Sequence, residues 1–247
     1  MRKLIIAMVF AALPGLVVAA GGEGYPLEKA DVDVSNKASL QRGAKLFVNY
    51  CMGCHSAEHQ RYNRLARDIG LSDEQVRDNL IFTGAKVGEQ MKNAMPKKDA
   101  KKWFGATPPD LTLIARSRGA DYLYTYLKTF YIDESRPWGV NNAAFPLVGM
   151  PHVLWELQGW QKAVVETHKD AEGNERSVIT GFEIVKPGSM SGPEFDKAMR
   201  DLVNFLVYVA EPIQLERTRI GVWVIAFLIL LTVVFYLLKK EYWKDVH

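Results

Sequence analysis

CMGCH (residues 51–55) contains both cysteines of this 247-residue chain and places a histidine directly after the second one. The segment before it, SLQRGAKLFVNY (residues 39–50), has the periodicity of a helix. Its apolar side chains share one helical face at Leu40, Ala44, Phe47 and Val48. The motif therefore follows an amphipathic helix, and this placement narrows its possible chemistry.

A Cys-x-x-Cys pair serves as a structural disulfide, as a redox-active pair or as the attachment site of a c-type haem. A redox pair normally opens a helix after a strand, and a zinc finger needs a second pair of ligands. A histidine after the second cysteine suits the proximal ligand of haem iron. The motif predicts one covalent haem c on Cys51 and Cys54, with His55 as an iron ligand.

Haem iron that only carries electrons usually has Met or a second His as its sixth ligand. Met95 and Met150 are both followed by a proline that stiffens the chain. Met150 follows the apolar run AAFPLVG (residues 143–149), whereas Met95 precedes the charged run KKDAKK (residues 97–102). We favour Met150, with Met95 and the nearby His152 as alternatives.

The N-terminus has a basic head, an apolar run and small residues at Val18 and Ala20. This pattern is typical of an export signal. Pro14 and Gly15 disfavour a membrane anchor that is retained. We predict a cleavable signal peptide over residues 1–20 and export of the following domain to the periplasm.

Residues 220–238 form a run of 19 residues without a charge. A helix of that length spans about 28 Å, close to the thickness of the hydrocarbon core of a bilayer. Lysines follow the run, and positive charge favours the cytoplasmic side. We therefore expect a haem domain over residues 21–219, a transmembrane helix over 220–238 and a cytoplasmic tail over 239–247. A buried core helix is the alternative.

Between the motif and the span, the sequence predicts helices joined by long loops. Ser72 and Gln75 form the pattern of a capping box, which indicates a helix over residues 71–84. The segment from residue 86 to 102 is expected to be a polar, basic loop. TPPDL (residues 107–111) is expected to lead into a short helix capped by Asp110.

Two β-rich runs flank KDAEGNER (residues 169–176), which predicts a small hairpin over residues 161–185. After Pro193, apolar residues recur at steps of three and four as far as Glu211, as in an amphipathic helix. The predicted fold class is mainly α. It is a c-type cytochrome domain with loop insertions and a small β-hairpin, plus one C-terminal transmembrane helix.

Several segments, in this order, resemble cytochrome c1, the haem subunit of the bacterial cytochrome bc1 complex. The similar segments are RGAKLFVNYCMGCHS (42–56) with RYNRL (61–65), PPDLTLIARSRG (108–119), GMPHVLW (149–155) and LVNFLVYVAEP (202–212). The resemblance covers nearly the whole chain after the signal peptide. The charged hairpin is expected to be an elaboration of this lineage.

The resemblance implies that His55 and Met150 are the axial ligands of the haem. It implies that Arg118, or Arg116 in its place, meets a haem propionate and that Pro109 contacts the haem. It also implies one-electron transfer from a Rieske iron–sulfur protein to a soluble or membrane-bound cytochrome c. The chain is then no enzyme by itself but a subunit of ubiquinol–cytochrome c reductase in the inner membrane. Cytochrome b and the Rieske subunit are the implied partners, in a dimeric complex.

Two other functions stay open: a periplasmic haem enzyme, and a membrane-tethered haem sensor or assembly factor. The chain carries a net charge of +3, but residues 1–20 and 239–247 hold all of this excess. Residues 21–219 are neutral before any haem is attached. The charge is therefore no indication of nucleic-acid binding, and a neutral-to-acidic domain is expected to suit a basic cytochrome c.

Overall fold

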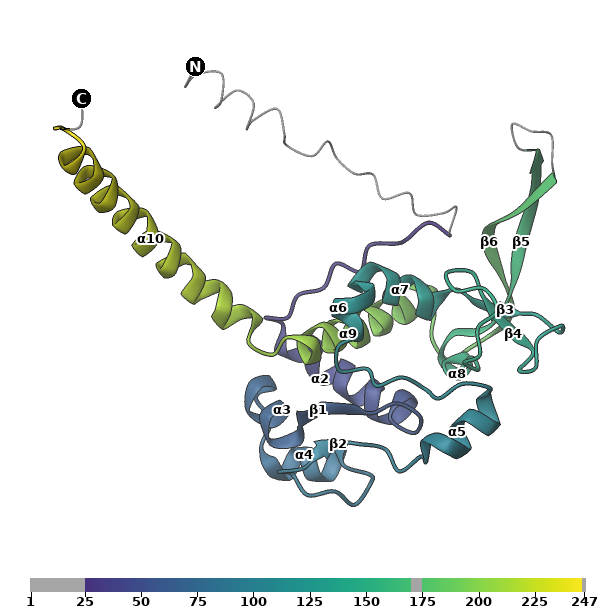
Figure 1. Ribbon diagram of the computed structural model, residues 1–247. Helices are drawn as coiled ribbons and strands as arrows, with labels where there is room; N and C mark the ends of the chain where they lie inside the picture. Colours follow the sequence, from purple (N-terminus) through teal and green to yellow (C-terminus); the bar gives the residue numbers. More distant parts are fainter. Residues whose placement is uncertain (1–24, 170–174, 246–247) are drawn as a thin grey trace.

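The computed structural model describes residues 25–169 and 175–245 (Figure 1). The predicted signal peptide and the turn of the predicted hairpin lie outside the described residues. Helices dominate the described part, as the mainly α fold class requires. The helical elements are α2 (Lys37–Leu46), the π-helical turn η1 (Phe47–Cys51), α3 (Tyr62–Ile69), α4 (Asp73–Leu80), α5 (Lys97–Phe104), α6 (Ile114–Arg118), α7 (Ala120–Lys128), α8 (Trp155–Gln158), α9 (Gly192–Ala210) and α10 (Gln214–Tyr242).

Helices α2 and α9 pack against each other at the centre of the domain. Gly43 permits the close approach, because a Cβ at this position would lie 2.1 Å from the carbonyl oxygen of Asp201. The Arg42 guanidinium donates to the Asp201 carboxylate at 2.5 and 2.9 Å. The rings of Phe47 and Phe205 lie 5.4 Å apart. Because η1 continues from α2 into CMGCH, this packing fixes the motif against the core.

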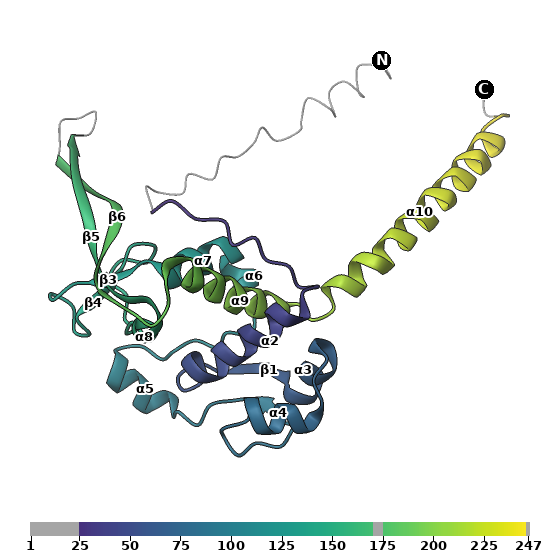
Figure 2. The same ribbon diagram turned by 180° about the vertical axis from the view of Figure 1, so that it is seen from behind.

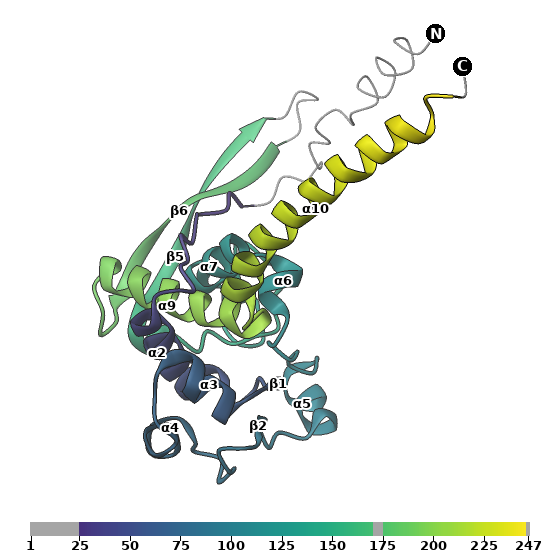
Figure 3. The ribbon, with the colours of Figure 1, turned by 90° about the vertical axis from the view of Figure 1, so that its left-hand side faces the viewer.

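Three antiparallel two-stranded sheets complete the part of the domain that the structure describes. The pairs are β1 (Ala57–Arg61) with β2 (Gln90–Met91), β3 (Phe130–Ile132) with β4 (Val140–Asn142), and β5 (Gly159–Lys169) with β6 (Glu175–Pro187). The β5–β6 pairing runs from Gly159 opposite Pro187 to Lys169 opposite Glu175. The hairpin expected over residues 161–185 is thus present and longer, and it stands away from the helices (Figures 1 and 3).

The structure differs from the sequence-based expectations in the middle of the chain. The predicted capping box of Ser72 and Gln75 starts α4, but the helix ends at Leu80 instead of reaching residue 84. The expected loop over residues 86–102 contains α5. Ala100 is the single buried residue of this helix, so its sequence has no apolar stripe that would predict a helix. Asp110 caps no helix, because its carboxylate accepts from the backbone N–H groups of Glu58 and Thr112.

Helix α10 extends away from the domain as a single long rod (Figures 1 and 2). It is long and apolar enough to cross a membrane, and none of its residues is buried against the rest of the protein. Its bounds, Gln214–Tyr242, extend beyond the predicted span of residues 220–238 at both ends. The buried core helix that was the alternative is therefore excluded.

Candidate functional site

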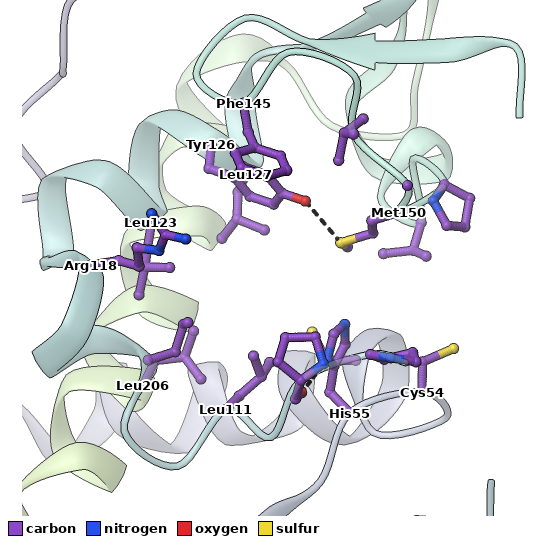
Figure 4. A pocket seen from close by; sticks show the side chains of 18 of the residues that line it. Cys54, His55, Leu111, Arg118, Leu123, Tyr126, Leu127, Phe145, Met150 and Leu206 are labelled. Atoms are coloured by element: carbon purple, nitrogen blue, oxygen red, sulfur yellow. Dashed lines mark hydrogen bonds between the residues drawn. The ribbon is translucent and has the colours of Figure 1, made fainter. Parts of the chain in front are cut away.

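A cavity of about 360 Å³ lies between the CMGCH segment and the loop that carries Met150 (Figure 4). Its volume falls in the range of about 300–1,000 Å³ that is usual for ligand pockets. The lining is mostly apolar, with side chains from α7 and α9 among the walls, including Leu123, Leu127, Leu202 and Leu206. The cavity is therefore shaped for a largely apolar group held between two opposed loops.

The floor of the cavity is the CMGCH segment. The π-helical turn η1 delivers Cys51, and the N–H groups of Cys54 and His55 both donate to the Cys51 carbonyl, which closes a tight turn. Both cysteines line the cavity as free thiols. Burial raises the pKa of the Cys51 thiol to about 12, so this thiol is protonated at neutral pH.

His55 is oriented by the main chain of the segment at residues 108–119. Its Nδ1–H donates to the carbonyl oxygen of Pro109 at 2.7 Å, and its other ring nitrogen points into the cavity (Figure 4). Burial lowers the pKa of His55, which favours the neutral imidazole that binds a metal. Pro109 lines the cavity too and acts on His55 through its backbone, as the outer partner of a metal-binding histidine does.

The roof of the cavity presents Met150, whose Sδ faces the His55 side (Figure 4). The Tyr126 hydroxyl donates to this Sδ at 3.3 Å. His152 is absent from the lining and is buried against Phe130, with the two ring centroids 5.1 Å apart. Met95 is absent from the lining as well. Of the three candidates for a sixth ligand, the cavity holds Met150 alone.

The profile of the Cytochrome C1 family matches residues 29–159 and 191–246 of this chain. The chain belongs to the cytochrome c1 family. A cytochrome c1 of Allochromatium vinosum is 54% identical over 247 residues, which is the whole of both chains. An ammonia monooxygenase gamma subunit of Nitrosomonas europaea is 47% identical, also over the whole of both chains. A cytochrome b/c1 of Bradyrhizobium diazoefficiens is 26% identical over 86% of this chain and 34% of its own length.

The residues of the cavity fit the haem c that the cytochrome c1 family binds. Two free thiols lie at one wall, and an imidazole nitrogen and a thioether sulfur face each other across an apolar space. Arg118 lies at the rim, exposed, with its guanidinium 5.5 Å from the centroid of the Tyr122 ring. Arg116, the alternative, points elsewhere and pairs with Glu211 at 3.4 Å. The cavity thus offers one cation at its edge for a carboxylate of the haem.

Sequence reasoning missed the part that Tyr126 plays in this cytochrome c1 site. Tyr126 shares one helical face with Leu123, Leu127 and Phe130, a pattern that core packing alone explains. Its ring does pack there, 5.2 Å from that of Phe130, but the hydroxyl points to Met150. The signal that could have found it is a tyrosine on an otherwise apolar face, since a buried hydroxyl requires a partner.

The hairpin is the part of the chain that the family profile leaves out. The two matched stretches are interrupted between residues 159 and 191, and β5 and β6 fill this interval. The lower part of the hairpin is anchored to the domain: Gln161 donates to the carbonyl oxygens of Lys128 and Phe130, and the Phe182 ring lies 5.7 Å from that of Tyr25. The interruption agrees with the expectation that the hairpin is an elaboration on the shared fold.

Proposed function

We propose that this protein is a membrane-anchored mono-haem cytochrome that passes single electrons from a Rieske protein to a cytochrome c. The observation that carries the proposal is the pair of His55 and Met150 on opposite walls of one cavity that also contains two free thiols. Thioether bonds to Cys51 and Cys54 would hold the haem. When bound, the haem supplies an iron that alternates between the ferric and ferrous states.

The residues of the chain have three tasks in this function. His55 and Met150 would both bind the iron, which would leave it no free position for a substrate. The leucines from α7 and α9 exclude water from the site. Arg118 would offset the charge of a propionate, because an unpaired charge at the edge of an apolar cavity is costly.

The same geometry argues against a haem enzyme and against a haem sensor. Peroxidase-type chemistry needs an open or labile sixth position with acid–base groups beside it. The lining residues include no carboxylate, and their histidine, His55, is needed as an iron ligand. A gas sensor likewise needs a position that a small ligand can take, whereas Met150 faces that position.

The partners and the membrane orientation extend the proposal. Members of the cytochrome c1 family operate within the bc1 complex, and one relative has a name that joins cytochrome b and c1. We place the haem domain in the periplasm of a bacterial inner membrane and the chain after α10 in the cytoplasm. Mild detergent purification through a C-terminal tag should recover cytochrome b and a Rieske protein. A chain that purifies alone from membranes would contradict the assignment to the complex.

Spectroscopy of ligand variants tests the site itself. The wild-type protein should contain a low-spin haem, and the oxidised form should show the weak near-infrared band of Met–iron ligation. Met150→Leu should remove this band, lower the midpoint potential and open the iron to carbon monoxide. Met95→Leu is the matched control and should leave all three unchanged. A high-spin ferric haem in the wild type, or an effect of Met95→Leu instead, would contradict the proposal.

A further inference from the structure

Helix α5 is the most basic surface element of the described domain. Its lysines are all exposed, and together with Lys92 they give residues 92–104 a net charge of +4. In the described part of the chain only one of them, Lys102, has a carboxylate within 4 Å, that of Asp99 at 3.8 Å. Because residues 21–219 are neutral as a whole, the rest of the domain carries −4, and the charge is strongly asymmetric.

The end of the helix lies against the cavity. Its last residue, Phe104, lines the cavity, and the chain that follows lines it too at Ala106 and Thr107. A Cβ on Gly149 would lie 3.5 Å from the Phe104 carbonyl oxygen, so the end of α5 packs beside the residue that precedes Met150. A protein that docks on α5 therefore lies next to the cavity.

Two exposed tryptophans flank these lysines. Trp103 is 56% exposed and Trp138, on the β3–β4 connection, is 44% exposed. The rings of Trp138 and Phe104 lie 5.5 Å apart, which joins the connection to the helix. Neither tryptophan lines the cavity, so a group bound inside it would leave both accessible. Exposed aromatic residues are enriched at docking surfaces.

The α5 face is defined here as Lys97, Lys98, Lys101, Lys102, Trp103 and Trp138. Helix α5 lies at the end of the domain away from α10 (Figures 1 and 2). If α10 crosses the membrane, α5 lies away from the bilayer, and its exposed lysines are open to a diffusing protein in the periplasm.

We propose that the α5 face docks a small, soluble, acidic electron carrier whose redox centre is surrounded by carboxylates. The inference rests on the proposed function, since the docked carrier accepts the single electron that the reduced protein gives up. No bond forms or breaks in this transfer. This proposal replaces the expectation of a basic cytochrome c. That expectation was based on the net charge of the domain, which conceals the local excess of positive charge on α5. Complementary charges of this kind speed encounter and make it sensitive to salt.

Stopped-flow oxidation of the reduced, full-length haem protein in detergent tests the proposal with two probes. These are plastocyanin, an acidic blue-copper protein, and mitochondrial cytochrome c, a basic haem protein. The rate with plastocyanin should fall about tenfold between roughly 0.01 and 0.15 M ionic strength, whereas the rate with cytochrome c should rise. Lys97→Glu/Lys101→Glu should lower the plastocyanin rate about tenfold at low ionic strength.

Lys162→Glu/Lys186→Glu is the matched control, because it makes the same charge change on the hairpin. It should alter the plastocyanin rate less than twofold, and the absorption spectrum and midpoint potential of both variants should equal those of the wild type. A plastocyanin rate that rises with salt, or that is indifferent to the α5 substitutions, overturns the docking surface and leaves the proposed function intact. A haem that cannot be reduced and reoxidised overturns both.

Discussion

His55 and Met150 each make one side-chain hydrogen bond. His55 is the donor in its bond, whereas Met150 is the acceptor. His55 donates to the Pro109 carbonyl, which makes the imidazole a stronger electron donor to a metal. Met150 accepts from the Tyr126 hydroxyl, which draws electron density away from the sulfur. The hydrogen bond at His55 therefore increases electron donation to a bound metal, whereas the hydrogen bond at Met150 decreases it.

Replacement of the Tyr126 hydroxyl isolates the second of these effects. Tyr126→Phe keeps the ring in place and leaves the Met150 sulfur a better donor, which favours the ferric state. We expect the midpoint potential to fall by about 30–60 mV, because 59 mV corresponds to a tenfold change in a one-electron equilibrium. Redox titration checks this. Tyr122→Phe, whose ring stacks on Tyr126 at 6.1 Å, is the control and should shift it much less. A rise in the Tyr126→Phe potential would refute the argument.

At the residue scale, the sequence could predict candidates but not their relations. Cys51, Cys54 and His55 are contiguous, so one local motif is enough to single them out. The contact between Tyr126 and Met150 joins residues 24 positions apart, and no local pattern encodes it. The choice of Met150 over Met95 rested on its apolar neighbours, which do line the cavity at Val148 and Gly149.

At the scale of elements, the contact between α2 and α9 is the feature on which the site depends. Gly43→Ala would place a methyl group 2.1 Å from the Asp201 backbone oxygen and 2.7 Å from the Phe205 Cβ. Backbone cannot yield as a flexible side chain does, so the helices must separate. Overpacking costs about 3 kcal/mol, against about 1 kcal/mol gained from the better helix propensity of alanine. The expected net loss is about 2 kcal/mol or more.

Chemical denaturation of the haem protein, followed by haem absorbance and circular dichroism, measures this loss. Gly88→Ala is the control, since Gly88 lies in an exposed turn where a Cβ meets nothing within 4 Å. It should leave the free energy of unfolding unchanged or slightly raised. Equal stability of the Gly43→Ala protein and the wild type would show that α2 and α9 do not need this close approach.

Elements with local signals were predictable, and elements defined by distant partners were not. The capping box at Ser72 and the amphipathic pattern after Pro193 each involve residues within a few helical turns of one another. Helices α4 and α9 start where these two patterns predict. The short strand β2 exists because it pairs with β1, about 30 residues earlier along the chain. For the same reason Met91, which reads as part of a polar loop, is fully buried.

At the scale of the whole molecule, charge and apolar character are distributed by segment. The net charge of +3 belongs to the two ends of the chain, and the neutral middle is itself divided between α5 and an acidic remainder. The net charge of the whole chain therefore concealed its basic face. The long apolar helix stands apart from the domain, which indicates that anchoring and haem binding are structurally separable.

This separation predicts the behaviour of a chain that ends at Ile213. None of the residues of α10 is buried, and its pairing of Arg217 with Glu211 leaves Glu211 still paired with Arg116. We expect the shortened protein to accumulate in the soluble periplasmic fraction, with the absorption spectrum and midpoint potential of the full-length chain. A chain that ends at Leu238 keeps the apolar run and should stay in the membrane fraction. Haem lost from the shorter protein would show that α10 supports the cavity after all, and a shorter protein still bound to membranes would place the anchor elsewhere.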